Sequence, residues 1–383
     1  MEAINQSATV HIADTATRLR QQGVQVIDLS AGRAAESTPA YIVEAAVGAM
    51  REGRTHQTMA RGAFEYRAAC AAKLARENQL DADPEREIIA TLGVKQGLML
   101  SLLATIDPGD EVIVEDPCFV SYGPLIHLAG GAAVPIPLRA ENGFRWTRDQ
   151  LEAGITGRTR AILFNSPHNP TGTVHADADL EVVASAAREH DLIVITDEVY
   201  ERVAWGDRRH VCLATRDGMR ERTVTVMGLT KTFAMGGWRV GFVFAPARLV
   251  DAMVTLQQHL VTCSNSFVQA GAAQAFGEPP RPEVVDTWRD WERRCAFLTG
   301  ALEAIPGVRC AMPEGGFYAW ADIRRLGQPS GEVAEMLLRE HHLAVVPGAA
   351  FGATGEGYLR FTCVRSWEDL RAAVPLLTKA LAA

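Results

Sequence analysis

The chain has little of what marks several classes of protein. It has no CxxC pair, no excess of basic residues and no apolar run long enough to cross a bilayer. The seven cysteines are scattered and odd in number, which predicts buried free thiols in a reducing cytosol, with neither disulfides nor a metal site. A net charge of −8 argues against nucleic acid or an anionic membrane as the main partner. Residues 1–6 do not resemble the start of a signal peptide, so we expect a cytoplasmic protein.

Lysine is also scarce: the chain has four lysines and 34 arginines. Lys73 lies in a pattern typical of an amphipathic surface helix, and Lys379 lies in the C-terminal helix. Lys231 differs, since it follows the apolar strand predicted at 223–227 and precedes a glycine-rich turn. Arginine holds its proton too firmly to form a Schiff base, whereas a partly buried lysine can attack an aldehyde. The position of Lys231 is therefore typical of a lysine that carries pyridoxal phosphate (PLP).

Apolar runs alternate with helical patterns through most of the chain. This alternation predicts an α/β fold, with a mostly parallel seven-stranded sheet and helices on both faces. A change of character after residue 282 predicts a smaller α+β domain. The strands are expected at 87–92, 111–115, 132–138, 160–165, 192–196, 223–227 and 239–245, with helices near 95–106, 119–129, 147–154 and 177–190. The smaller domain is expected to contain a long helix at 283–304, strands at 308–312, 316–321, 343–346 and 357–362, and final helices.

The predicted organisation therefore has two domains. Residues 41–282 are expected to form the large domain. Residues 1–40 are too short to fold alone, and we expect them to join residues 283–383 in the small domain. This N-terminal part is expected to contain a helix at 12–22 and a strand at 24–29, before large-domain helices at 41–53 and 63–79.

Polar residues follow two of the predicted strands, at the edge where ligands gather in open α/β sheets. Asp197 ends the strand at 192–196 and can pair with a pyridinium nitrogen, although an acid in this place is as often the N-cap of a helix. Asn169 lies in the rigid loop Asn165–Gly172, and its amide can donate to a phenolate oxygen; a plain turn is the alternative. His168 in the same loop is more often structural than catalytic.

Three other features also have a functional and a structural interpretation. The turn and helix start at residues 91–98 can bind a phosphate, with help from Thr230 and Arg239, although many α/β crossovers look similar. Phe119 can stack on a cofactor ring, or it is a core aromatic. Arg360 lies in an apolar strand, where it can clamp a carboxylate or form a structural ion pair.

Together these motifs resemble the fold-type I PLP enzymes, in particular the class I/II aminotransferases related to aspartate aminotransferase. The resemblance covers about residues 10–380 and is strongest in Asn165–Gly172, Thr196–Tyr200, Thr230–Gly241 and Tyr358–Phe361. It implies PLP as the cofactor, an amino acid and a 2-oxo acid as substrates, and a homodimer with shared active sites.

The resemblance also implies roles for single residues. Lys231 resembles the Schiff-base lysine and general acid–base, and Asp197 the partner of the pyridine nitrogen. Asn169 and Tyr200 resemble the donors to the ring hydroxyl oxygen. The remaining positions are Phe119 for ring stacking, Val94, Lys95, Gln96, Thr230 and Arg239 for the phosphate, and Arg360, Gly32 and Asn169 for the substrate.

Three positions depart from the family pattern. Gln57 stands where many members have a tyrosine that reaches across the dimer, Arg33 and Ala34 follow Gly32 in place of Glu-Pro, and Gly228 replaces a frequent serine.

The main hypothesis is ping-pong amino transfer. The alternative is a specialised PLP enzyme of the same fold that catalyses β-elimination or replacement, cyclisation or oxidation of an amino acid. A non-enzymatic sensing domain is disfavoured because no basic helix stands out.

The substrate side chain is not identified by the sequence. Lys95 can attract a distal carboxylate. His11, Arg33, Gln57 and Arg61 are further candidates for lining the pocket.

Overall fold

The computed structural model of the chain describes residues 8–276 and 280–382, so the expectation about a signal peptide at residues 1–6 lies outside the described part. A seven-stranded sheet forms the centre, in the order β2-β8-β7-β6-β5-β3-β4. All neighbours are parallel except β8, which is antiparallel to β2 and β7. The predicted fold class is therefore confirmed. The strands are β2 (Ile88–Thr91), β3 (Glu111–Asp116), β4 (Ala132–Pro137), β5 (Thr159–Asn165), β6 (Ile193–Asp197), β7 (Thr223–Gly228) and β8 (Gly241–Phe244).

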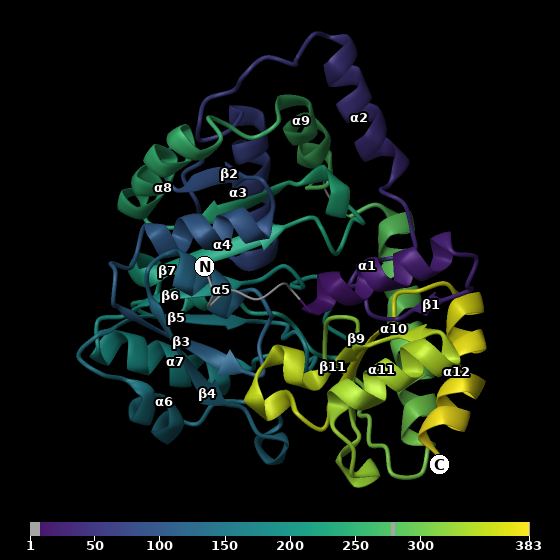
Figure 1. Cartoon of the computed structure of the whole chain (residues 1–383). Helices are drawn as coiled ribbons and strands as arrows, with labels where there is room; N and C mark the ends of the chain where they lie inside the picture. Colours follow the sequence, from purple (N-terminus) through teal and green to yellow (C-terminus); the bar gives the residue numbers. More distant parts are fainter. Residues whose placement is uncertain (1–7, 277–279, 383) are drawn as a thin grey trace.

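Helices cover both faces of this sheet (Figure 1). Alternate residues of β3 show the two faces, because Val112 and Val114 pack in one cluster while Ile113 packs in another. The first cluster includes α4 (Val94–Leu103), α5 (Tyr122–Leu128) and α8 (Ala247–Leu260). The second includes α6 (Arg148–Gly154) and α7 (Asp177–Glu189), and a third cluster packs α3 (Phe64–Asn78) and α9 (Ser266–Gln274) against β2 and β8.

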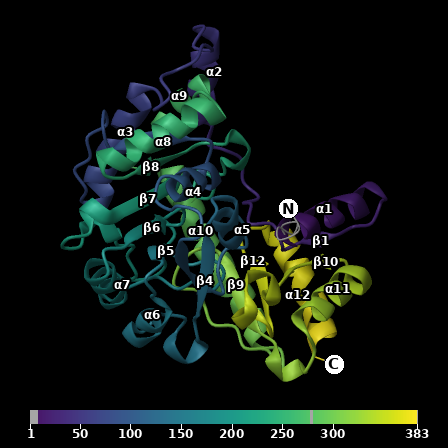
Figure 2. The same ribbon diagram turned by 60° about the vertical axis from the view of Figure 1, so that its left-hand side comes forward.

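The C-terminal part forms a second body beside the sheet (Figure 2). It contains the antiparallel sheet β11-β12-β9 and a short parallel pair between β1 and β10. The N-terminal helix α1 and strand β1 lie in this body, which is where the predicted small domain places them. Its elements are α1 (Ala8–Gln21), β1 (Ile27–Asp28), α10 (Pro282–Glu303), β9 (Tyr318–Asp322), α11 (Ser330–His341), β10 (Leu343–Ala344), β11 (Val346–Pro347), β12 (Tyr358–Thr362) and α12 (Trp367–Leu381). The domain boundaries themselves stay a prediction.

Several expected elements differ in the structure. Strand β1 has two residues where six were expected, and the strand expected at 308–312 is reduced to one isolated bridge between Arg309 and Asp322. Strand β1 pairs with β10 at two residues only, and Arg309 has the end of β9 as its partner. Helices α8 and α9 had no counterpart among the predictions, and α2 (Ala40–Arg51) has nearly the expected range. Among the described residues, no helix is long and apolar enough to cross a membrane.

Lys73 is not a surface residue, contrary to the prediction. Its side chain is fully buried, and its ammonium contacts the carboxylate of Glu201 and donates to Oδ1 of Asn78, 2.6 Å away. Helix α3 packs against both α9 and β2, so it is buried on more than the single apolar face of an amphipathic surface helix. The partner Glu201 comes from the loop after β6, which the local pattern could not reveal.

Candidate active site

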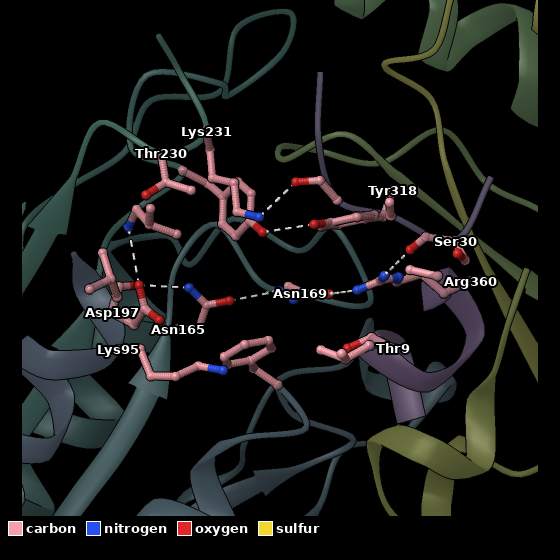
Figure 3. A pocket seen from close by; sticks show the side chains of 18 of the residues that line it. Thr9, Ser30, Lys95, Asn165, Asn169, Asp197, Thr230, Lys231, Tyr318 and Arg360 are labelled. Carbon is pink, nitrogen blue, oxygen red and sulfur yellow. Dashed lines mark hydrogen bonds between the residues drawn. The ribbon is translucent and has the colours of Figure 1, made fainter. Parts of the chain in front are cut away.

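Four neighbouring strands end in Asp116, Asn165, Asp197 and Gly228 at one edge of the sheet. A cavity of about 470 Å³ lies between this edge and the C-terminal body (Figure 3). The residues that line the cavity are Thr9, Val10, Ala13, Ser30, Ala31, Gly32, Val94, Lys95, Phe119, Asn165, Asn169, Asp197, Val199, Tyr200, Thr230, Lys231, Arg239, Tyr318 and Arg360. Every site residue predicted from the sequence is among them except Gln96.

Lys231 extends from the turn after β7 into this cavity. Its Nζ donates a hydrogen bond to the carbonyl oxygen of Gly32, 2.7 Å away. A Cβ on Gly32 would overlap the hydroxyl of Tyr318 and would lie 3.2 Å from Nζ of Lys231. Glycine at position 32 therefore leaves room for the amine and the phenol to approach the backbone.

Asp197 forms the floor of the cavity at the end of β6. Tyr122 Oη donates to its Oδ2 at 3.0 Å, and the backbone N–H of Val199 donates to its Oδ1 at 3.3 Å. Burial raises the pKa of the Asp197 carboxyl to about 6, and these two donors together with the charge of Lys231 oppose the rise. The carboxylate is thus destabilised unless a cation binds in front of it.

Asn165 and Asn169 connect the floor to the far wall. The side chain of Asn165 donates to the carbonyl of Asp197 at 2.6 Å and accepts from the backbone N–H of Asn169 at 2.7 Å. Oδ1 of Asn169 accepts from Nη1 of Arg360 at 3.0 Å, and Nη2 of Arg360 donates to the carbonyl of Ser30 at 2.8 Å. A continuous set of hydrogen bonds therefore runs from the sheet to β12.

Arg360 is buried in the C-terminal wall of the cavity. Its guanidinium carbon lies 4.2 Å from the ring centre of Tyr318, and burial lowers its pKa below the ordinary value. Nε of Arg360 has no hydrogen-bond partner among the described residues. No carboxylate faces this guanidinium within ion-pair distance there, so the structural ion pair considered above is absent from the described part of the chain.

Positive charge gathers at the N-terminus of α4. Lys95 lies in its first turn, and Arg239 reaches the preceding loop by donating to the carbonyl of Leu92 at 3.2 Å. Burial, followed by the charges of Arg239 and Lys231, lowers the pKa of Lys95. Gly93 has φ +79°, and a Cβ there would lie 2.7 Å from Nη2 of Arg239. The unpaired N–H groups of the helix, its dipole and these cations suit an anion such as phosphate.

Two phenols and one phenyl ring complete the walls. The hydroxyls of Tyr200 and Tyr318 are 3.0 Å apart, and Lys95 Nζ lies 5.6 Å from the ring centre of Phe119. Burial alone would raise the pKa of Tyr318, but the charges of Lys231 and Arg360 outweigh burial and lower it. The pKa of Tyr200 is raised by burial and by its neighbour Tyr318. The pair therefore has one phenol that ionises more easily than the other.

The structure corrects several sequence-based assignments. The side chain of Gln96 turns back to accept from the backbone N–H of Leu92 at 2.6 Å, so only its backbone belongs to the helix start. Arg61 pairs with Asp251 at 2.6 Å, and His11 lines a separate groove against α11. Arg33 and Gln57 are exposed and do not line the cavity within one chain, and the place of Gln57 at the cross-dimer position stays a prediction. His168 is buried behind the cavity wall.

Sequence reasoning also missed several lining residues. Tyr318 and Ser30 come from segments far from Lys231 in the chain, and Thr9 comes from α1. The side-chain role of Asn165 had a signal, because it ends β5 just as Asp197 ends the neighbouring β6. Tyr122 had a weaker signal, since it lies one helical turn after Phe119 at the same edge.

Known proteins share both the sequence and this architecture. A model of the family described as aminotransferase class I and II matches residues 24–376. An aspartate aminotransferase of Pyrococcus abyssi is 40% identical over 382 residues, covering 100% of this chain and 97% of its own. An aromatic-amino-acid aminotransferase 2 of Thermococcus litoralis is 38% identical, covering 100% and 97%. The structure of an aspartate aminotransferase from Thermus thermophilus with maleate matches with a TM-score of 0.94 at 36% identity, over 99% of this chain and 98% of that one.

The chain belongs to the class I and II aminotransferases.

Members of this family are generally PLP dependent, and the residues of this aminotransferase fit that cofactor. The anion-binding start of α4, the buried carboxyl of Asp197 and the amine of Lys231 all face one cavity. Phe119 lines the same cavity beside Lys95 at the start of α4. The family match confirms the resemblance to class I/II aminotransferases that the sequence predicted, and it confirms that the protein is a transferase.

Proposed function

We propose that this aminotransferase holds PLP covalently on Lys231 and moves an α-amino group between an amino acid and a 2-oxo acid. The observation that supports this proposal most strongly is the position of Lys231 Nζ in one cavity with Asp197 and Arg360. An amine, a buried carboxyl and a guanidinium are the groups that PLP-dependent amino transfer requires at its lysine, ring nitrogen and substrate carboxylate.

The start of α4 would hold the phosphate. Backbone N–H groups at Val94 and Lys95 point out of the helix start, and Arg239 and Thr230 line the same side of the cavity. Gly93 keeps this surface open, since a Cβ there would run into Arg239. The charge-assisted hydrogen bonds would fix the phosphate and thereby the position of the ring.

Asp197, Asn169, Tyr200 and Phe119 would hold the ring. PLP, when bound, supplies an aldehyde that takes up the amino group and a ring that withdraws electrons from the substrate. The carboxylate of Asp197 would accept the hydrogen bond of the protonated ring nitrogen, a cation that compensates for burial. The phenol of Tyr200 and the amide of Asn169 would donate to the ring hydroxyl oxygen, and Phe119 would stack on the ring.

Lys231 and Arg360 would carry the transfer itself. Released from its covalent link, Nζ of Lys231 would remove the α-proton of the substrate and return it on the neighbouring carbon. Arg360 would bind the α-carboxylate with its guanidinium, so that the Cα–H bond points towards Lys231. The hydrogen bonds of Arg360 to Asn169 and Ser30 fix the guanidinium before substrate arrives.

Borohydride reduction followed by peptide mapping tests the covalent link. We expect reduction to fix the vitamin B6 group on Lys231, with Lys95 unlabelled as an internal control from the same cavity. The variant Lys231→Ala should fold, bind PLP without a covalent bond and have no measurable turnover. A label on another lysine, or full activity of Lys231→Ala, would refute the proposal. A requirement for a 2-oxo acid acceptor distinguishes transfer from elimination or oxidation.

We propose further that the substrate is an acidic amino acid. Lys95 reaches into the cavity beside Phe119 and offers a cation at some distance from Arg360 (Figure 3). The relative from Pyrococcus abyssi is named an aspartate aminotransferase, and the Thermus thermophilus structure has maleate, a dicarboxylate. The neighbouring Val10 and Ala13 are apolar, which leaves the aromatic amino acids as the competing class.

The variant Lys95→Gln distinguishes the two substrate classes. With PLP saturating, we expect kcat/KM for aspartate to fall about tenfold or more, which corresponds to the roughly 1.5–3 kcal/mol of a charge-assisted hydrogen bond. The kcat/KM for phenylalanine should change little. Equal losses for both substrates would mean that Lys95 acts on the cofactor and that the acidic assignment is wrong.

We also propose that the protein is a homodimer with active sites near the interface. Large apolar side chains are exposed on α2, in the segment 59–64 and at the end of α8. These segments lie in one region of the molecule: α2 contacts α9, Gln269 of α9 accepts the backbone N–H of Ala63, and Gln257 of α8 binds the carbonyl of Ala60. The exposed side chains are Val43, Met50, Met59, Phe64, Leu260 and Val261.

Analytical ultracentrifugation tests this association. We expect a dimer for the wild type, and a shift to monomer with loss of activity for the double variant Met59→Asp, Phe64→Asp. The matched control is Leu128→Asp, which changes an exposed leucine on α5 outside these segments. A monomeric, fully active wild type would exclude the shared-site arrangement.

A further inference from the structure

Three titratable side chains are buried together behind the wall of the cavity. Glu115 lies near the end of β3, His168 in the loop Asn165–Gly172, and His175 just before α7. Their side chains are 0–3% exposed, and none lines the cavity. The proposed mechanism uses none of them.

The cluster contains unsatisfied polar atoms. Oε2 of Glu115 accepts the backbone N–H of Asn165 at 3.1 Å and lies 3.4 Å from Nε2 of His168. Oε1 of Glu115 lies 3.8 Å from Nε2 of His175. Neither Oε1 nor these two imidazole nitrogens has a hydrogen-bond partner among the described residues. A proton shared between a carboxyl oxygen of Glu115 and the facing imidazole nitrogen would satisfy both atoms.

The surroundings of Glu115 disfavour a carboxylate. Within the described ranges, no lysine or arginine lies at ion-pair distance, and the acids Asp116 and Asp197 are close in the chain and in space. A buried charge without a cation costs several kcal/mol. Burial raises the pKa of Glu115 far above its ordinary value, and it lowers the pKa of His168 to about 3 and of His175 to about 4. Other titratable groups that face the cluster are Cys118, Tyr122, Arg145, Asp179 and His210.

We propose that Glu115 is a positioning residue that acts as a neutral carboxyl: its proton lies towards the imidazole of His168 or of His175, and its Oε2 accepts the backbone N–H of Asn165. A neutral imidazole has one nitrogen that accepts, so the O–H of Glu115 has an acceptor wherever that nitrogen is the Nε2 that faces it. Nδ1 of His168 is already 2.7 Å from the hydroxyl of Thr171, and Nε2 is the ring nitrogen that faces Oε2 of Glu115.

This arrangement acts on the site through Asn165. The side chain of Asn165 binds the carbonyl of Asp197 and the backbone N–H of Asn169, so a shift of Asn165 moves both residues. A neutral Glu115 holds Asn165 without adding a second negative charge beside Asp197. That charge would raise the pKa of Asp197 further and remove the carboxylate that the ring nitrogen needs.

Infrared difference spectroscopy of the purified protein at neutral pH tests the charge state. We expect the difference between wild type and Glu115→Gln to show the C=O stretch of a protonated carboxyl. The control is Glu201→Gln, where the acid pairs with the buried Lys73 and should show carboxylate bands only. Carboxylate bands in the Glu115 difference would overturn the proposal.

A second measurement tests the positioning role and rests on the proposed function. The absorbance of the bound cofactor is titrated with pH in Glu115→Gln and Glu115→Ala. Glutamine is neutral and has the shape of the protonated acid, so we expect Glu115→Gln to keep the wild-type midpoint, whereas Glu115→Ala should shift it. A shift in Glu115→Gln as large as that in Glu115→Ala would overturn the proposal. Absence of any cofactor absorbance in the wild type would instead refute the proposed function, and the infrared result would still decide the state of Glu115.

Discussion

Arg360 and Asn169 meet across the cavity, where Nη1 of the arginine donates to Oδ1 of the asparagine at 3.0 Å although 191 residues separate them. Arg360 belongs to β12 of the C-terminal body, and Asn169 belongs to the loop after β5 of the central sheet. Nη2 of the same arginine binds the carbonyl of Ser30. The guanidinium is therefore held from both bodies, with its plane fixed for a carboxylate.

The variant Arg360→Lys should lose this fixed geometry. A lysine keeps the charge but cannot bind a carboxylate with two parallel hydrogen bonds. We therefore expect kcat/KM for amino acids to fall roughly 30- to 1000-fold, which corresponds to a loss of about 2–4 kcal/mol of transition-state stabilisation. The measurement is steady-state kinetics with saturating PLP. Amines without an α-carboxylate serve as the control, because their slow turnover should not change. Equal losses for both kinds of substrate would place the role of Arg360 elsewhere.

Gly228 and Val94 form a second pair with a measurable consequence. A Cβ on Gly228 would lie 2.7 Å from Cγ2 of Val94, at the start of the helix proposed to bind phosphate. Gly228→Ser should therefore displace Val94 and weaken PLP binding by about 1–2 kcal/mol, the cost of moderate overpacking. Titration of cofactor-free protein with PLP measures the loss.

Two further variants check that the loss is steric. The double variant Val94→Ala, Gly228→Ser should recover most of the affinity, since it removes the methyl groups that clash. Gly237→Ala is the matched control, because a Cβ there meets nothing within 4 Å. Wild-type affinity in Gly228→Ser would show that this loop adapts freely.

The sequence predicted the sheet and its functional edge for one physical reason. The inner parallel strands are apolar runs buried on both faces, and β5 and β6 end in the polar residues Asn165 and Asp197. Lys231 stood out because lysines are scarce and this one follows a buried strand. Local patterns therefore gave the part of the site that lies in consecutive residues.

The rest of the site depends on contacts between distant segments. Tyr318 reaches Tyr200 from 118 residues away, and Ser30 binds Arg360 over 330 residues. Gln96 has the spacing of a phosphate-binding residue, yet its side chain binds the backbone of Leu92. No local pattern records such pairings. The prediction that Lys73 lies on the surface was wrong for the same reason, because its counter-ion Glu201 is 128 residues away.

The carboxyl of Asp197 should make the cofactor-free protein sensitive to pH. Its pKa is about 6 in the folded chain against an ordinary value of 3.8, so the folded state binds more protons between about pH 4 and pH 6. This contribution to stability is present below about pH 4 and is lost as the pH rises to about 6. The total is on the order of 2–3 kcal/mol. Urea unfolding at several pH values measures it.

The variant Asp197→Asn isolates this effect. It should flatten the fall in stability between about pH 4 and pH 6 and leave cofactor-free protein more stable than wild type at pH 7. The same change should abolish turnover, because asparagine cannot hold the protonated ring nitrogen. An unchanged pH dependence in Asp197→Asn would show that another group causes it.

The buried pair of Lys73 and Glu201 predicts a large loss of stability from a single substitution. Glu201 follows Tyr200, so the pair also anchors the loop that carries this phenol. Lys73→Met would leave the carboxylate of Glu201 buried without its ammonium partner, and we expect the free energy of unfolding to fall by about 3–5 kcal/mol. The double variant Lys73→Met, Glu201→Leu should lose less than the sum of the single variants, which a double-mutant cycle in urea measures.

The pH dependence and an exposed control complete this test. Burial would raise the pKa of Glu201, but Lys73 and then Arg202 outweigh it and hold the pKa at about 2. Its contribution is therefore present above about pH 4 and is lost as the pH falls towards 2, and Lys73→Met should weaken this acid sensitivity. The exposed pair Glu335–Arg339, with 2.7 Å between its charged atoms, should contribute less than about 0.5 kcal/mol in the same cycle. Coupling at Lys73–Glu201 as small as at this exposed pair would mean that water reaches the buried ammonium.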